Sequence, residues 1–348
     1  MAPQVGHSSW PALAALRRFR SVHLINPLWN ATGGSELRTV ALFDELKESC
    51  SVRLWTEYSA DPALKRTYPV RRIVLRRLSF PKTGTFVFVG VYRRPRRWIH
   101  LTRPRRVIVI YNTPDPDLLS DMLAILAPRV SRPVEIVYAS EALKRSVGYP
   151  GVVQASPVDL EMFRPAEQSR ARGDGADFVV GRLSRDVPEK HHHRDGAFYQ
   201  QLAAAGVRVR VMGGTCLAQV SSVGWDHDGR RIEILPVGAA EPNLFLRELD
   251  CFFYRTADHW TEPFGRVVME AMACGLPVVC HNRGGYAEVI EHGRNGFLFE
   301  SDAEAFEIIQ RLRQDLALRK AVGRAARETV ERLYSPLQRR ETIDYYTR

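Results

Sequence analysis

Short runs of β-branched and apolar residues alternate with helical patterns along most of this 348-residue chain. Such runs are typical of strands covered on both faces, and their alternation with helices favours parallel, doubly wound sheets. In the first half the expected strands cover residues 21–28, 51–55, 85–92, 106–111 and 134–140. In the second half they cover residues 178–180, 207–212, 232–235, 251–254 and 277–281. The sequence therefore predicts an α/β fold with one Rossmann-like sheet in each half.

The two series are separated by Arg164–Asp177, a polar, aperiodic stretch that contains glycine and is typical of a linker. We expect an N-terminal domain over residues 1–165 and a second domain over residues 166–330. Residues 331–348 are expected to form a helix that returns toward the N-terminal domain. Because ligands bind at the carboxyl ends of the strands in such sheets, the expected site is a central cleft between the domains.

The composition argues for a soluble chain in a reducing compartment. The five cysteines include no Cys-x-x-Cys pair, which disfavours both a disulfide framework and a zinc ribbon. No apolar run approaches the roughly 18–20 residues of a membrane-spanning helix. The N-terminus does not resemble a signal peptide, because basic residues follow the apolar stretch Trp10–Leu16 instead of preceding it. We expect a cytoplasmic protein.

The positive charge is concentrated in one segment. Residues 61–110 contain 14 Lys and Arg and one acid, Asp61, and so carry +13, whereas the whole chain carries +11. Such a patch suits polyanions, and Trp98 lies in it among seven arginines of Val91–Arg106. We expect a patch that docks on an anionic membrane surface or an acceptor, formed by Arg93, Arg94, Arg96, Arg97 and Trp98. The alternative is a solvated, arginine-rich loop.

The most specific stretch is Thr261–Pro277, TEPFGRVVMEAMACGLP. Its first residues predict a turn that leads into a helix over Arg266–Cys274, which the following Gly and Pro end. Gly265 allows a ligand to approach the backbone, and the first N–H groups of the helix suit an anion such as a diphosphate. Glu262 and Glu270 would lie about 12 Å apart along the chain, too far for an acid/base pair acting on one bond. They could hold opposite ends of one long ligand.

The spacing of Glu262 and Glu270 resembles the donor-binding element of glycosyltransferase family 4, whose members are retaining enzymes with the GT-B fold. Other segments resemble the family in the same order along the chain, namely Gly33–Gly34, Ser156–Pro165, Gly181–Lys190 and Pro277–Phe299. The resemblance is weakest over residues 55–105. It implies two doubly wound domains that face a central cleft.

The resemblance also implies roles for single residues. Glu262 would contact the hydroxyls of the donor sugar, and Glu270 would bind the nucleotide ribose. The turn residues Pro263, Phe264 and Gly265 would line the donor site.

Two further pairs complete the implied site. Arg182 and Lys190 would hold the diphosphate, although three more residues separate them than is common in the family. Gly33 and Gly34 would close on the phosphates and the acceptor. Two cations and a helix N-terminus can stabilise the charge of a leaving diphosphate without a metal. The resemblance therefore implies no cofactor and no metal.

Asn112 stands where many members of the family carry a histidine. An amide can hydrogen-bond a hydroxyl group but cannot take a proton at neutral pH. The departing phosphate would then accept the proton of the acceptor. The implied activity is a hexosyltransferase reaction that moves a sugar from a nucleotide-diphospho-sugar to a lipid-linked glycan acceptor in polysaccharide or lipopolysaccharide biosynthesis. The protein would then be cytoplasmic, or peripheral on the inner face of the membrane.

Three metal-like patterns have simpler explanations. Three consecutive imidazoles at His191–His193 cannot all face one ion from regular structure, which favours a solvated loop. Asp115-Pro-Asp117 and Asp226-His-Asp228 match the Asp-x-Asp metal motif of a different glycosyltransferase fold. Neither lies in the donor elements described above.

Two other functions stay open at this point. A nucleotide-sugar epimerase can have the same two-domain fold, and it would isomerise a donor without any acceptor. A nucleic-acid-binding protein would explain the basic segment, but the segment has few aromatic residues for base stacking and no recognised motif. The glutamate pair and its flanking segments favour the transferase.

Overall fold

A computed structural model of the chain describes residues 21–90, 95–166, 178–217 and 231–348. The chain divides into two compact units. Unit 1 ends at Pro157 and also includes Ser335–Arg348, and unit 2 is Val158–Tyr334. The boundary therefore precedes the expected one at residue 165. The reason is local, because Phe163 is buried and its carbonyl accepts a hydrogen bond of 2.7 Å from Arg327, a residue of unit 2.

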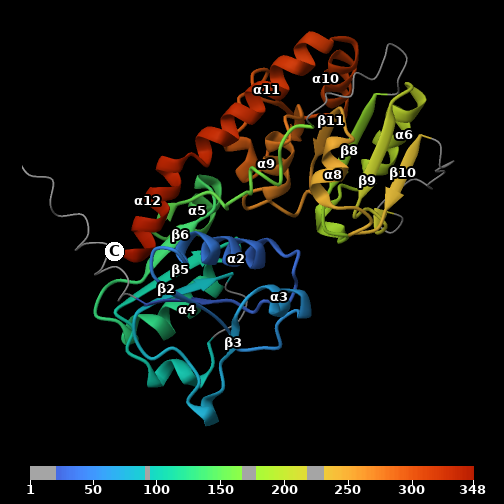
Figure 1. Ribbon diagram of the computed structural model, residues 1–348. Coiled ribbons are helices and arrows are strands. Elements are labelled where there is room, and N and C mark those ends of the chain that lie inside the picture. Colours follow the sequence, from blue (N-terminus) through green and yellow to red (C-terminus); the bar gives the residue numbers. More distant parts are fainter. Residues whose placement is uncertain (1–20, 91–94, 167–177, 218–230) are drawn as a thin grey trace, which may run out of the picture. The chain divides into compact units, whose positions relative to one another are not determined.

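Unit 1 contains a parallel seven-stranded sheet with the order β3-β2-β1-β4-β5-β6-β7 (Figure 1). Its strands are β1 (Ser21–Ile25), β2 (Ser51–Thr56), β3 (Val70–Arg72), β4 (Thr85–Val89), β5 (Arg106–Tyr111), β6 (Glu135–Tyr138) and β7 (Val152–Val153). Its helices are α2 (Gly34–Leu46), α3 (Pro62–Thr67), α4 (Pro116–Leu126), α5 (Glu141–Val147) and α12 (Pro336–Thr347), with short 3-10 turns η1 (Leu75–Arg77), η2 (Arg97–Leu101) and η3 (Ala127–Arg129).

Alternate residues of these strands point to opposite faces of the sheet, and both faces are covered. On one face, β4 packs through Val87 and Val89 against α2 and against Tyr346 of α12. On the other face, Phe86 and Phe88 pack with residues of η2, α4 and α5. This two-sided burial explains the nearly continuous apolar runs of the central strands.

Unit 2 contains a parallel six-stranded sheet with the order β10-β9-β8-β11-β12-β13. Its strands are β8 (Val179–Leu183), β9 (Arg208–Met212), β10 (Ile232–Leu235), β11 (Cys251–Tyr254), β12 (Val278–His281) and β13 (Phe297–Phe299). Its helices are α6 (Asp195–Ala204), α8 (Pro242–Arg247), α9 (Arg266–Ala273), α10 (Asp302–Gln314) and α11 (Leu316–Leu333), with 3-10 turns η4 (Pro188–Lys190) and η5 (Gly285–Glu288). One core joins the sheet to α6, α10 and α11.

The central strands of both sheets match the expected runs, which confirms the doubly wound α/β class. The edge strands β3, β7 and β13 were not expected, because they contain only two or three residues. The helix after the first strand, α2, begins at Gly34, and in its first turn the Ser35 hydroxyl donates to the Glu36 carboxylate at 2.7 Å.

Trp98 is not a surface residue, so its expected place at a membrane interface is wrong. The side chain is 1% exposed and belongs to the core on one face of the unit 1 sheet. Its ring lies 6.2 Å from Phe86 and 6.5 Å from Phe88, and its indole N–H donates to the Glu57 carboxylate. A buried partner for the indole nitrogen removes the reason for Trp98 to face a lipid surface.

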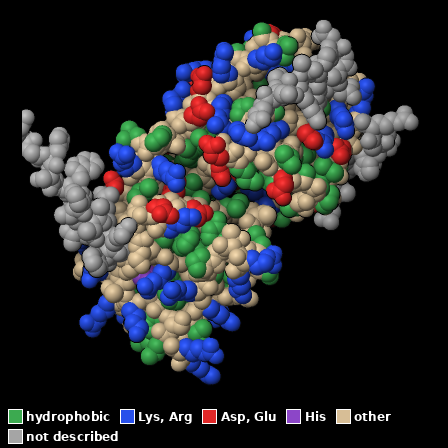
Figure 2. All heavy atoms as spheres, in the orientation of Figure 1, with side chains coloured by type: hydrophobic (Ala, Val, Ile, Leu, Met, Phe, Trp, Pro, Cys, Tyr) green, Lys and Arg blue, Asp and Glu red, His purple; other side chains and the backbone are tan. Residues whose placement is uncertain are grey.

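The other members of the expected patch differ in position. Arg96 and Arg97 are exposed, and the Arg96 guanidinium lies 3.5 Å from the Glu57 carboxylate and 5.0 Å from the centre of the Tyr58 ring. Arg93 and Arg94 lie outside the described residues. Figure 2 shows many Lys and Arg side chains on the surface of unit 1.

The C-terminal helix α12 is part of unit 1. Tyr346 is 1% exposed, and its hydroxyl donates to the Gln154 side chain at 2.9 Å. Arg106, at the start of β5, donates to the carbonyl of Tyr345 and forms an ion pair with Glu135. The last helix is therefore an integral part of the unit 1 core.

His23 of β1 is a neutral buried imidazole. It is 3% exposed, and its Nδ1 accepts a hydrogen bond of 2.9 Å from the Trp55 indole. Burial, with help from the charges of Arg53 and Arg71, lowers the pKa of His23 to about 4. A protonated Nδ1 could not accept the indole hydrogen, so the native state opposes protonation.

This pKa predicts an acid-sensitive unit 1. Because the folded pKa lies below the unfolded value, the stabilisation is fully present above pH 6.5 and is lost as the pH falls toward 4. For wild type we expect the His23 contribution to the free energy of unfolding to fall by roughly 3 kcal/mol over that range. Urea unfolding at several pH values should show a flatter pH dependence for His23→Gln. The exposed control His100→Gln should follow wild type, and parallel profiles for His23→Gln and wild type would contradict the assignment.

Candidate functional site

The strand order of unit 2 reverses between β8 and β11, so the chain leaves these two neighbouring strands toward opposite sides of the sheet. Such a switch point leaves a crevice at the carboxyl ends of the strands, where doubly wound proteins bind ligands. Arg182 lies near the end of β8, and Lys190 ends η4 in the following loop. Tyr254 ends β11, and Glu262 lies in the loop between β11 and α9. Four polar side chains therefore gather at one switch point.

Lys190 and Glu262 form a direct ion pair although 72 residues separate them. The same carboxylate oxygen of Glu262 also accepts a hydrogen bond of 2.9 Å from the Tyr254 hydroxyl. The side chains of Lys190 and Glu262 are only 10% and 12% exposed. Burial alone would raise the pKa of Glu262, but the Lys190 ammonium and the Tyr254 hydroxyl outweigh burial and hold this pKa below its usual value. Glu262 is therefore an anion beside a cation.

Arg182 is a buried neighbour of this pair. Its guanidinium is 1% exposed, forms a 3.0 Å ion pair with Asp195 and donates to the Lys190 carbonyl. It also lies 4.9 Å from the centre of the Tyr254 ring. The expected direct contact of Arg182 with a diphosphate does not match this geometry, because the guanidinium is covered and already paired. In the structure Arg182 fixes the backbone that carries Lys190.

Asp195 at the start of α6 was not singled out in the sequence. Its carboxylate is fully buried and binds both Arg182 and Arg255, the latter at 2.5 Å, and it accepts the His192 N–H at 3.0 Å. Burial opposes its ionisation, but the guanidinium groups of Arg255 and Arg182 hold the pKa of Asp195 below its usual value. A single aspartate in a polar loop carries no sequence signal for this role.

Gly265 occupies the N-cap of α9 with a φ of +80°, a left-handed conformation that side chains disfavour. A Cβ on Gly265 would also lie 2.5 Å from the Tyr286 ring, so no larger residue fits. Phe264 is buried and Pro263 is half-buried. The turn thus presents the open N–H groups of an eight-residue helix, as the sequence predicts.

A second glycine, Gly284, supports the turn that carries Glu262. It was not singled out in the sequence. Gly284 has a φ of +92°, and a Cβ there would lie 2.8 Å from the Glu262 carbonyl oxygen. The N–H of Gly285 donates to that carbonyl at 2.9 Å. Gly284 and Gly285, at the start of η5, therefore fix the backbone of Glu262, and this Gly-Gly dipeptide is the sequence feature that could have indicated the support.

Glu270 is 6% exposed on α9 and accepts a 2.7 Å hydrogen bond from the Arg266 guanidinium, one helical turn earlier. Burial raises the pKa of Glu270 above its usual value, and Arg266 only partly offsets this effect. A buried carboxyl group with one cationic partner keeps capacity for a further donor such as a ribose hydroxyl.

The three consecutive histidines divide between two environments. His191 is fully buried, and its Nε2 donates to the Gly213 carbonyl at 2.8 Å. His192 and His193 instead lie beside Asp258, with nitrogen–oxygen distances of 3.2 and 3.7 Å. Asp115, from the first Asp-x-Asp pattern, caps α4 by accepting the N–H groups of its first turn. Asp226 and Asp228 lie outside the described residues.

In unit 1, Gly33 and Gly34 follow β1 at the start of α2. A Cβ on Gly33 would lie 2.3 Å from the Glu36 carboxylate, whereas a Cβ on Gly34 would meet nothing within 4 Å. A larger residue at Gly33 would therefore displace the end of the Glu36 side chain, and Gly34 leaves an open backbone. Both stand at the carboxyl end of β1, at the point where the unit 1 sheet reverses its order.

Asn112 directly follows β5 and is held by Arg38 of α2. The Arg38 guanidinium donates to the Asn112 side-chain oxygen at 3.2 Å and to the Gln154 carbonyl at 2.9 Å. Because arginine can only donate, this contact orients the Asn112 amide with its oxygen toward Arg38, and the NH₂ group is the donor that Asn112 can offer a ligand.

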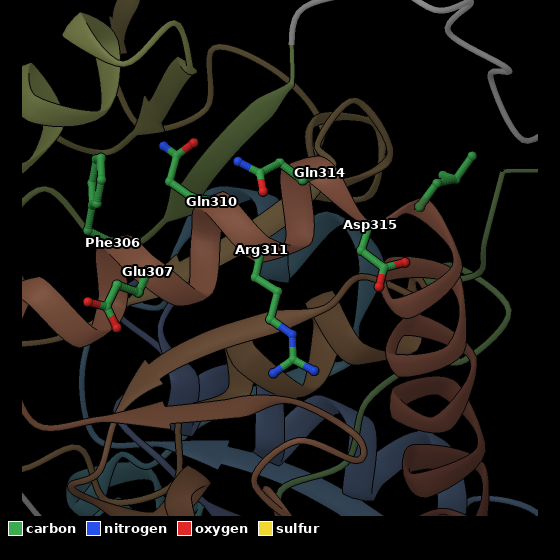
Figure 3. Close-up of a pocket in the computed structure, with 7 residues that line it drawn as sticks. Phe306, Glu307, Gln310, Arg311, Gln314 and Asp315 are labelled. Atoms are coloured by element: carbon green, nitrogen blue, oxygen red, sulfur yellow. The ribbon is translucent and has the colours of Figure 1, made fainter.

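A hollow on the surface of α10 lies elsewhere in unit 2 (Figure 3). Its lining residues are Phe306, Glu307, Gln310, Arg311, Gln314, Asp315 and Leu316. None of these is a sequence-predicted site residue.

Comparison with known proteins shows similarity to glycosyltransferases. Residues 230–329 match the family described as "Glycosyl transferases group 1". The chain is 29% identical over 222 residues to a D-inositol 3-phosphate glycosyltransferase of Pseudarthrobacter chlorophenolicus, covering 58% of this chain and 50% of the relative. It is 24% identical over 222 residues to the capsular polysaccharide biosynthesis glycosyltransferase CapM of Staphylococcus aureus, covering 61% of this chain and 57% of CapM.

The chain spans from about a fifth to about half of the length of the first curated relatives that it matches. Among solved structures, Anabaena HepE in complex with UDP is similar over 93% of this chain and 98% of HepE, with a TM-score of 0.70 and 18% identity. At this identity the likeness shows the fold, and the two parallel-sheet units of this chain have the α/β architecture of the GT-B fold.

Proposed function

We propose that this chain is a retaining glycosyltransferase of family 4 that moves a sugar from a nucleotide-diphospho-sugar to a glycan acceptor. The observation that carries the proposal is the contact of Lys190 with Glu262 at the switch point of unit 2. A cation suits a diphosphate, and a carboxylate suits sugar hydroxyls. In a nucleotide sugar the reacting bond joins these two groups, so a site for it needs the cation and the carboxylate side by side.

The surroundings of the pair support a leaving diphosphate. Lys190 would contact the phosphate oxygens together with the N–H groups after Gly265. Arg182 would act as a positioning residue, because its guanidinium holds the Lys190 carbonyl. Losing one preorganised contact to developing charge typically costs about 10²–10³ in rate. The proposed chemistry needs no metal, since these groups supply the positive charge.

Unit 1 would supply the acceptor side of the reaction. Gly34 gives an open backbone at the carboxyl end of β1, and Asn112 presents an NH₂ group at the end of β5. An NH₂ group donates to a sugar or phosphate oxygen and cannot take a proton. The proton of the acceptor hydroxyl would therefore pass to the departing phosphate, as in a front-face reaction that retains configuration.

The donor and acceptor classes follow from relatives. HepE has been solved with UDP and with UDP-glucose, which supports a UDP-hexose as the first donor to test. CapM is named for capsular polysaccharide biosynthesis, which supports a glycan acceptor, and we propose that a lipid carries this glycan. The described residues contain no helix long and apolar enough to cross a membrane. A protein of this kind would reach such an acceptor from the cytoplasm as a peripheral protein.

Lys190→Ala tests the diphosphate contact. We expect UDP-glucose to bind at least about tenfold more weakly, because a hydrogen bond to a charged group contributes about 1.5–3 kcal/mol. Isothermal titration of wild type, Lys190→Ala and Lys190→Arg measures this effect, and Lys144→Ala on α5 is the control. Turnover that is unchanged by EDTA would agree with a metal-independent reaction. Unaltered donor affinity in Lys190→Ala would refute the assigned contact.

Substitution of the two glutamates should reduce ligand binding in different ways. In thermal-shift measurements, Glu262→Gln should keep the stabilisation by UDP and lose the extra stabilisation by UDP-glucose, because the variant weakens the sugar contact and leaves the Lys190 ammonium for the diphosphate. Glu270→Gln should lose both, because its proposed partner is the ribose. Glu304→Gln in the first turn of α10 is the control. Equal losses in both variants would contradict the separate roles, and isomerised donor formed without acceptor would favour an epimerase.

A further inference from the structure

A short finger projects from unit 1 directly after β3. We define the finger as Val74–Ser79, which contains the 3-10 turn η1. Val74 and Ser79 exchange two backbone hydrogen bonds of 2.9 and 3.2 Å across its base. Inside the finger, the N–H of Leu78 donates to the Leu75 carbonyl at 3.0 Å. The finger is therefore a closed, hydrogen-bonded turn whose shape is fixed before any partner arrives.

The finger exposes two leucines. Leu75 is 40% exposed and Leu78 is 61% exposed, and neither belongs to a core cluster among the described residues. Leu78 also has a φ of +49°, a left-handed conformation that costs a non-glycine residue about 1 kcal/mol. Folding gains little from a leucine that is strained and mostly in water. Glycine would suit the backbone better at this position.

The surroundings of the leucines are strongly basic. Arg76 and Arg77 lie between them, and neither has an acidic partner among the described residues. Arg71 and Arg72 of β3 are exposed, and the Ser79 hydroxyl donates to the Arg72 carbonyl at 3.2 Å, which ties the finger to that strand. Residues 62–114 contain no Asp or Glu. The lower end of unit 1 in Figures 1 and 2, where β3 and the chain after it lie, shows several Lys and Arg side chains.

We propose that the finger docks on an anionic lipid bilayer, with Leu75 and Leu78 inserted among the acyl chains and Arg76 and Arg77 on the headgroups. Exposed aliphatic side chains beside arginines match both layers of such a surface. Nucleic acid would match the charge but not the leucines, because base stacking uses aromatic side chains. The finger thus supplies the apolar contact that Trp98, which is buried, cannot supply.

This proposal stands apart from the catalytic one, since binding to vesicles requires no donor or acceptor. Each basic residue near an anionic surface strengthens binding about fivefold, and an inserted leucine side chain strengthens it at least about tenfold. Either contribution alone gives weak, reversible binding. The two together suit a peripheral protein that associates and leaves.

The test is co-sedimentation of the full chain with vesicles of phosphatidylcholine, with and without phosphatidylglycerol. We expect binding to the anionic vesicles only, weakening as salt rises. Leu78→Gly should lower the partition coefficient about tenfold, because it removes one inserted side chain. Its melting temperature should be unchanged or higher, since glycine relieves the backbone strain. Arg76→Gln with Arg77→Gln should lower the partition coefficient about thirtyfold.

Helix α12 offers a matched control in the same unit. Leu337 is 63% exposed, and Arg339 and Arg340 are exposed beside it. Leu337→Gly, and separately Arg339→Gln with Arg340→Gln, should leave vesicle binding at the wild-type level. The proposal is overturned if wild type does not bind anionic vesicles, or if Leu78→Gly binds them as well as wild type. Binding to DNA that depends on the two finger arginines, without vesicle binding, would also overturn it.

Discussion

The buried carboxylate of Asp195 is the constraint on which the candidate site depends. It forms ion pairs with two buried guanidinium groups, Arg182 and Arg255, and accepts the backbone N–H of His192. Arg182 in turn holds the Lys190 carbonyl, so the loop that carries Lys190 is anchored to α6 through one acid. Removing one partner of a buried ion pair leaves an uncompensated charge, which typically costs about 3–5 kcal/mol. The geometry of the Lys190–Glu262 pair thus rests on a group that need not touch any ligand.

The Glu262 side of the site has an independent support. The carbonyl of Glu262 accepts the Gly285 N–H, and Gly284 leaves room for that approach. Tyr286 then fills the space beside Gly265. A backbone hydrogen bond from η5 therefore holds the turn, while the Arg182 guanidinium holds the carbonyl of Lys190. Two separate elements fix the two halves of the ion pair, which is how a surface loop can present a defined geometry.

The sequence predicted the central strands because they are buried on both faces and read as continuous apolar runs. It did not predict β3, whose three residues Val70–Arg72 are mostly polar and lie at the edge of the sheet. It predicted an exposed position for Trp98, which is wrong. A tryptophan among arginines has the same local sequence pattern whether its indole N–H donates to a buried Glu57 or to solvent. That partner lies 41 residues away in the sequence. Tertiary contacts of this kind leave no periodic pattern in the sequence.

In the candidate site, the local sequence was enough to predict the turn at Gly265 and the helix after it, since glycine and proline mark their ends. The pairing of Lys190 with Glu262 depends on how β8 and β11 lie side by side, which no local pattern reveals. The Lys190–Glu262 ion pair also determines the order in which parts of a ligand are recognised. In the structure Lys190 already has an internal counter-ion, Glu262, and a neutral monosaccharide carries no charge that could replace it. A diphosphate does, so fragments that contain the nucleotide should be captured before free sugars are.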